Sequence, residues 1–80
     1  MNIKSVESTT LVAIGYDATR ELLELEFRSH AVYRYFGVPS SVYEELWAAP
    51  SKGRYFNGTI RGHFPHSLIS RTSSAQGGES

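Results

Sequence analysis

The sequence predicts an α+β fold in which a three-stranded antiparallel β-meander is followed by two helices packed on one face. The first observation is residues 21–28, where apolar and charged side chains alternate with the period of two of a half-buried strand. The second is a pair of later segments in which apolar residues recur at helical spacing. The 80 residues suit one domain, and because the chain has no cysteine, that domain has no disulfide framework.

Three strands are expected, at about residues 10–16, 21–28 and 32–37. The register between the last two strands depends on the length of the loop that joins them. A two-residue loop at Ser29-His30 would place Arg34 on the core face. A three-residue loop instead buries the tyrosine rings and sets Phe27 opposite Tyr33, Leu25 opposite Tyr35, and Glu26 opposite Arg34. We favour the three-residue loop, with His30 as the residue that takes a positive φ.

The two helices are separated by Ala49-Pro50. Ser41 with Glu44 fits a capping box for the first helix, although Ser40 could be the cap instead. The second helix is expected from about Ser51 to Arg61. The expected core is made of Val12, Ile14, Leu23, Leu25, Phe27, Tyr33, Tyr35, Val42, Leu46, Trp47, Tyr55, Phe56 and Ile60. The other face of the sheet would then carry Leu11, Ala13, Leu22, Val32 and Phe36, which is unusually apolar for a face in water.

Composition narrows the classes of function. The net charge of zero argues against a protein that binds nucleic acid mainly through electrostatic attraction. The charge is unevenly distributed, however, because residues 1–48 carry a net charge of −3 and residues 49–80 a net charge of +3. No apolar run is long enough to span a membrane, and the N-terminus lacks the apolar segment of a signal peptide. We therefore expect a cytoplasmic protein with no membrane partner. Residues 70–80, rich in Ser and Gly, are expected to be a disordered tail.

The first candidate site is Ser51-Lys52-Gly53-Arg54, at the start of the second helix. Two cations and a glycine are unfavourable there, because a helix N-terminus carries a partial positive charge and glycine lowers helix stability. A bound phosphate would offset these costs by using the free N–H groups and both cations. The alternative is that Ser51 only caps the helix, the charges face solvent, and Gly53 relieves crowding against the core.

Other candidate sites are weaker. Tyr33-Arg34-Tyr35 could stack bases and hold a phosphate, but the register favours buried tyrosine rings. His63 and His66 are separated by a proline and lack a third ligand, so no metal site is predicted. No nucleophile, base and acid can be assembled from the sequence, so no catalytic residue and no cofactor are expected.

Several motifs together resemble the KTSC domain, a short module found at the C-terminus of some lysyl-tRNA synthetases and as a stand-alone bacterial protein. The resemblance covers about Val6 to Phe64 and differs at the second hairpin, where His30 and Ala31 replace the family's usual glycine. It implies a fold more firmly than a function, because the family has no established activity and RNA binding is only suggested for it. The matching elements are Gly15-Tyr16, Leu25, Phe27, Tyr33-Arg34-Tyr35, Val38-Pro39, Ser51-Lys52-Gly53-Arg54-Tyr55-Phe56-Asn57 and Ile60-Arg61.

These observations favour a non-catalytic binding module with RNA as its ligand. The residues expected to contact phosphate are Ser51, Lys52, Gly53, Arg54, Asn57, Arg61 and Arg34. The alternative is a module that binds another protein, or a second copy of itself, through the apolar outer face of the sheet.

Overall fold

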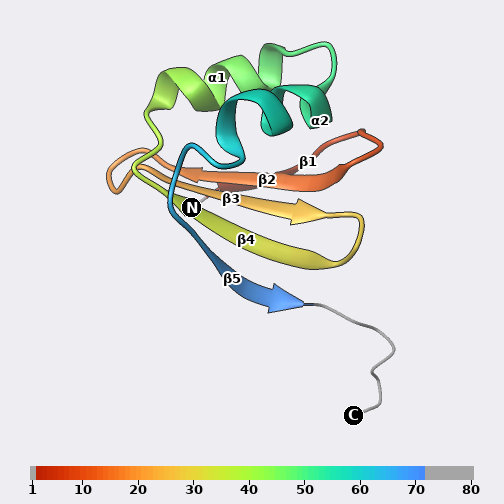
Figure 1. The fold of residues 1–80 in the computed structure, drawn as a ribbon, viewed down its shortest axis with the longest axis horizontal. Helices are drawn as coiled ribbons and strands as arrows, with labels where there is room; N and C mark the ends of the chain where they lie inside the picture. The colour runs from red at the N-terminus through yellow and green to blue at the C-terminus, as the bar shows by residue number, and fades with distance from the viewer. Residues whose placement is uncertain (1, 72–80) are drawn as a thin grey trace.

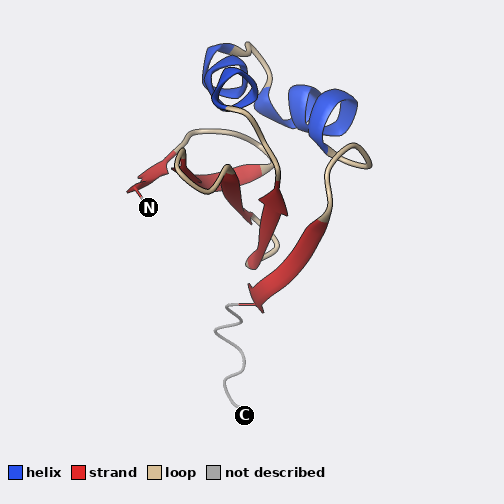
Figure 2. Cartoon of the chain, turned by 90° about the vertical axis from the view of Figure 1, so that its left-hand side faces the viewer, coloured by secondary structure: helices blue, strands red, loops and turns tan. Residues whose placement is uncertain are grey.

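The computed structural model describes residues 2–71 and shows a five-stranded antiparallel sheet in the order β1-β2-β3-β4-β5, with two helices on one side (Figure 1). Figure 2 shows both helices over the same side of the curved sheet. Within residues 2–71, no helix is both long and apolar enough to span a membrane. The elements are β1 (Asn2–Ser5), β2 (Leu11–Asp17), β3 (Leu22–Phe27), β4 (Ala31–Phe36), α1 (Ser40–Ala48), α2 (Lys52–Tyr55), the π-helical turn η1 (Phe56–Ile60) and β5 (His66–Arg71).

The α+β class is confirmed, but the sheet has five strands and not the predicted three. The two additional strands, β1 and β5, form the sheet edges and pair with β2 and β4. Both are rich in polar residues and lack the alternation that identified β3, because an edge strand can be held by backbone hydrogen bonds alone. Ser70 and Arg71 of the predicted tail belong to β5, and the rest of that tail lies outside the described residues.

The predicted register between β3 and β4 was wrong by two positions. Leu25 faces Tyr33 and Leu23 faces Tyr35, while Arg34 lies opposite Glu24 and not Glu26. The connection does have three residues, but they are residues 28–30, one position earlier than expected. A shift of two preserves the parity of the side chains, so the tyrosines still share a face with the leucines. The expected positive φ of His30 is confirmed at 74°.

A β-bulge in β2 changes which side chains enter the core. The register shifts between Leu11 and Ala13, so Leu11 pairs with Phe27 and is fully buried. The assignment of Leu11 to the outer face was therefore wrong, and Val12, predicted in the core, is only half-buried. Ala13 pairs with Glu26 on the outer face, as expected, and is buried there.

The helix starts also differ from expectation. Pro39 occupies the N-cap of α1 and no side chain accepts a hydrogen bond there, so the predicted cap by Ser41 or Ser40 was wrong. Proline fixes φ and leads into the first turn without a capping hydroxyl. The second helix does begin after Ser51, whose Oγ accepts a hydrogen bond from the Arg54 amide (3.3 Å). After one turn it widens into η1, where the Arg61 amide donates to the Phe56 carbonyl oxygen (2.8 Å).

The hydrophobic core lies between the sheet and the helices. Most of the predicted core residues either belong to it or pack against it, and Trp47, Phe27 and Tyr33 are half-buried at its margin. The buried cluster consists of Leu11, Ile14, Leu23, Leu25, Tyr35, Val38, Leu46, Phe56 and Ile60.

Candidate functional site

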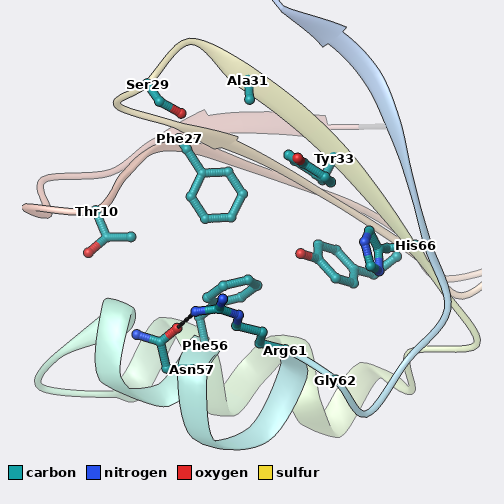
Figure 3. Close-up of a pocket in the computed structure, with 11 residues that line it drawn as sticks. Thr10, Phe27, Ser29, Ala31, Tyr33, Phe56, Asn57, Arg61, Gly62 and His66 are labelled. Atoms are coloured by element: carbon teal, nitrogen blue, oxygen red, sulfur yellow. Dashed lines mark hydrogen bonds between the residues drawn. The ribbon is translucent and has the colours of Figure 1, made fainter.

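An open pocket of about 560 Å³ lies between η1 and the end of the sheet formed by β3, β4 and β5 (Figure 3). Its apolar walls are aromatic and come from Phe27, Tyr33, Tyr35, Phe56 and His66. We call it the aromatic pocket. Ligand pockets typically combine such apolar walls with a few placed polar groups, so this pocket is the candidate functional site.

Strand parity and the helix turn bring the rings together. The phenyl rings of Phe27 and Phe56 meet edge-on, with centroids 5.1 Å apart, and the ring of Tyr35 meets Phe56 at 5.7 Å. The imidazole of His66 lies 5.6 Å from the Tyr33 ring and 5.3 Å from the Tyr35 ring. These contacts hold the walls of the pocket in place, while its open side leaves room for a planar group to stack.

The polar rim is provided by η1 and the residue that follows it. The Arg61 guanidinium donates from Nη1 to the Asn57 Oδ1 (3.4 Å), which is visible as the dashed line in Figure 3. Both side chains belong to exposed residues, and within residues 2–71 no carboxylate lines the pocket. π-helical turns are rare, and those that occur are often found at functional sites. The position of η1 beside the pocket agrees with this tendency.

The tyrosine at the base of the pocket stays protonated near neutral pH. Burial is the main cause that raises the pKa of the Tyr35 hydroxyl above its ordinary value; Tyr33 adds to this rise, whereas Arg61 opposes it. A neutral phenol can donate a hydrogen bond, and the nearby guanidinium supplies a positive charge. The pocket can therefore hold a planar group with acceptor or anionic oxygens.

At the start of α2, where the anion corner was predicted, Lys52 and Gly53 make contacts within the chain. The Lys52 Nζ donates to the carbonyl oxygens of Trp47 (3.1 Å) and Ala49 (3.3 Å), and it lies 5.7 Å from the centroid of the Trp47 ring. Lys52 thus stabilises the C-terminus of α1. Gly53 is buried, and a Cβ there would overlap the Thr10 side chain, so a packing role accounts for this glycine. Arg54 is exposed.

The predicted site residues therefore fall into three separate groups. Asn57 and Arg61 lie at the aromatic pocket, whereas Ser51 and Lys52 line a smaller polar hollow elsewhere. Arg34 points to the opposite face of the sheet, where its Nη2 lies 3.0 Å from the Glu24 Oε2. Strand alternation separates Arg34 from the tyrosines on either side of it.

Sequence reasoning missed the contribution of two rings to the pocket. His66 was considered only as a metal ligand, and among the described residues no cluster of three or more His, Cys, Asp or Glu could hold a metal ion. Its position in the pocket follows from β5, which was not predicted. Phe56 was assigned to the core and is indeed buried, but it also lines the pocket.

The fold is an antiparallel sheet with two helices on one face and a pocket at one end. Residues 7–64 match the KTSC domain family, and the chain belongs to this family. The crystal structure of a KTSC domain protein from Yersinia pestis is similar, with a TM-score of 0.84 and 38% identity, over 86% of this chain and 97% of that one.

Relatives are of two lengths. A protein of Tsukamurella paurometabola is 40% identical over 62 residues, which are 78% of this chain and 92% of that protein. A lysine–tRNA ligase from a Nostoc species is 45% identical over 64 residues, 80% of this chain. The chain spans only 11% of the length of that ligase, so the similarity concerns one module of a much longer protein.

Proposed function

We propose that this domain is a non-catalytic module that binds single-stranded RNA and holds one nucleotide in the aromatic pocket. The observation that carries the proposal is the pocket itself, which combines aromatic walls with Arg61 and has no carboxylate among the described residues that line it. The occurrence of similar modules within lysine–tRNA ligases supports RNA as the ligand class.

The roles follow from the chemistry of each side chain. A base would stack on Tyr33 and His66, since stacking of a base on an aromatic ring contributes about 1–3 kcal/mol and tolerates any base. The Arg61 guanidinium and the Asn57 amide would contact the adjoining phosphate and sugar. With so few contacts, binding should be weak, with a dissociation constant of micromolar order or higher. Lys52, Gly53 and Arg34 have no part in this proposal, because each is occupied elsewhere.

The test compares two arginines in the same segment of the chain. We expect Arg61→Ala to weaken binding of an eight-nucleotide single-stranded RNA about tenfold, because a charge-assisted contact is lost. The same substitution should reduce the log–log salt slope by about 0.7, the value for one phosphate contact. Fluorescence anisotropy at two salt concentrations measures both quantities.

Arg54→Ala is the matched control, since Arg54 is an exposed arginine that does not line the pocket. It should leave affinity within about twofold of the unmodified protein, a change of less than about 0.5 kcal/mol. Equal losses of RNA affinity in the two variants would contradict the proposal. So would the absence of RNA binding by the unmodified protein at low salt.

A second candidate function is binding to another protein, or to a second copy, through the outer face of the sheet. It is favoured by the exposure of Ile3 and Phe36 on that side. The Glu24–Arg34 ion pair crosses the same face and makes it more polar. A molecular mass that rises with protein concentration, and that Phe36→Ser returns to the monomer value, would support this candidate over RNA binding.

A further inference from the structure

Arg28 provides a second cation beside the aromatic pocket, at the end formed by the β3–β4 hairpin. It lies between Phe27 and Ser29 in the chain, and both of these residues line the pocket. The Arg28 amide donates to the carbonyl oxygen of Thr10 (3.0 Å), and Thr10 is a lining residue as well. The backbone of Arg28 is therefore fixed by three residues of the pocket wall.

The Arg28 side chain is held in place but keeps most of its hydrogen-bonding capacity. Its Nε donates to the carbonyl oxygen of Ser8 (2.7 Å), which anchors the guanidinium on the loop between β1 and β2. A guanidinium has five N–H groups, so this bond leaves four for other acceptors. The residue is exposed, and within residues 2–71 no carboxylate forms an ion pair with it. The Arg28 guanidinium can therefore bind an anion from solution.

The acidic residues nearest to Arg28 in the sequence and on the neighbouring loop do not line the pocket. Glu26 shares the strand parity of Glu24, so it lies on the outer face of the sheet. Glu7 precedes Ser8, but it lines the smaller polar hollow together with Lys52. Neither carboxylate is among the groups that an anion in the aromatic pocket would meet.

The two arginines border opposite ends of the pocket. The lining residues extend along β4 from Ala31, next to the hairpin, to Tyr35. These two positions are about 13 Å apart, because a strand rises about 3.3 Å per residue. Figure 3 shows Ser29 at the hairpin end and Gly62, the residue after Arg61, at the other end. A chain that crosses the pocket lengthwise would therefore pass from one arginine to the other.

We propose that Arg28 contacts a second phosphate of the bound RNA, so that the nucleotide in the pocket has one phosphate at Arg61 and the other at Arg28. This inference rests on the proposed function and defines the smallest ligand that fills the site, a nucleoside with phosphates on both its 3′ and its 5′ oxygen. Arginine suits this role because its planar guanidinium can donate two parallel N–H groups to one phosphate.

The first test compares uridine 3′,5′-bisphosphate with the 3′- and 5′-monophosphates of uridine, by calorimetric titration of the unmodified domain. We expect the bisphosphate to bind about tenfold more tightly than the better monophosphate, the change for one charge-assisted contact. This comparison does not depend on the stability of any variant. Arg28→Ala should remove the advantage of the bisphosphate. The control Arg20→Ala, which changes an exposed arginine outside the pocket, should keep it.

The salt dependence of binding to the eight-nucleotide RNA gives a second readout. Two phosphate contacts predict a log–log slope of about −1.4 for the unmodified domain, because each contact contributes about −0.7. Arg28→Ala should bring the slope to about −0.7, whereas Arg28→Lys, which keeps the positive charge, should retain most of it. Arg20→Ala should leave the slope unchanged.

Two results would overturn the second phosphate contact and leave binding at Arg61 standing. One is equal affinity of the unmodified domain for the bisphosphate and the better monophosphate. The other is a salt slope that does not change in a folded Arg28→Ala variant. Failure of the unmodified domain to bind the RNA and all three nucleotides at low salt would overturn the proposed function as well.

Discussion

Two basic segments lie only a few residues apart in the chain, and the structure uses them differently. At the start of α2, Lys52 is held by the carbonyl oxygens of Trp47 and Ala49 at the end of α1, and Gly53 packs against Thr10. At the end of η1, the Arg61 guanidinium donates a hydrogen bond to Asn57 and borders the aromatic pocket. The comparison teaches that a cation is available to a ligand where the acceptors of the same chain leave most of its N–H groups unused.

The largest effect that this comparison predicts concerns Gly53. Gly53→Ala should lower the free energy of unfolding by about 1–3 kcal/mol, because the added Cβ would overlap the β-branched side chain of Thr10. Chemical denaturation followed by the fluorescence of Trp47 would measure the change. The result separates a packing role from a ligand-binding role, since a glycine kept for a ligand would tolerate alanine in the free protein.

Gly58→Ala is the matched control in η1. Nothing lies within 4 Å of a Cβ built at Gly58, and alanine restricts the unfolded chain more than glycine does. We expect a stability change between zero and a gain of about 1 kcal/mol. A loss at Gly58 as large as that at Gly53 would show that backbone geometry, and not contact with Thr10, explains both glycines.

A smaller effect is expected for Lys52→Ala. The variant loses two hydrogen bonds to the C-terminal carbonyl groups of α1 and the contact with the Trp47 ring, which together should cost about 1 kcal/mol of stability. Its affinity for RNA should stay within about twofold, in contrast to that of Arg61→Ala. Thermal unfolding and anisotropy check the two parts, and a variant of unchanged stability with weakened RNA binding would restore the corner at α2 as the site.

The parts of the fold that were predicted from sequence are those with a strong local pattern. The alternation of Leu23, Leu25 and Phe27 identified the central strand and its inner face, and this parity survived a register error. The edge strands β1 and β5 carry no such pattern, because backbone pairing does not depend on apolar alternation. The bulge near Leu11 depends on the pairing of two strands, which the residues of one strand do not reveal.

The candidate site was predictable only in part, for a related reason. Asn57 and Arg61 were among the residues assigned to RNA, and the structure places both at the pocket. Lys52 was assigned to phosphate because spacing alone does not show that its side chain reaches back to the carbonyl of Trp47. His66 enters the pocket only through β5, so it could not be found before that strand was known.

The most direct test of RNA binding at the aromatic pocket is a nuclear magnetic resonance titration of isotope-labelled protein with oligouridine at low salt. We expect the largest shifts for the amides of Tyr33, Tyr35, Phe56, Arg61 and His66, and small shifts for residues 51–54. Raising the salt concentration should reverse the shifts in part, because the phosphate contact with Arg61 is screened. Shifts confined to residues 51–54 or to the outer face of the sheet, or no shifts at all, would contradict the account.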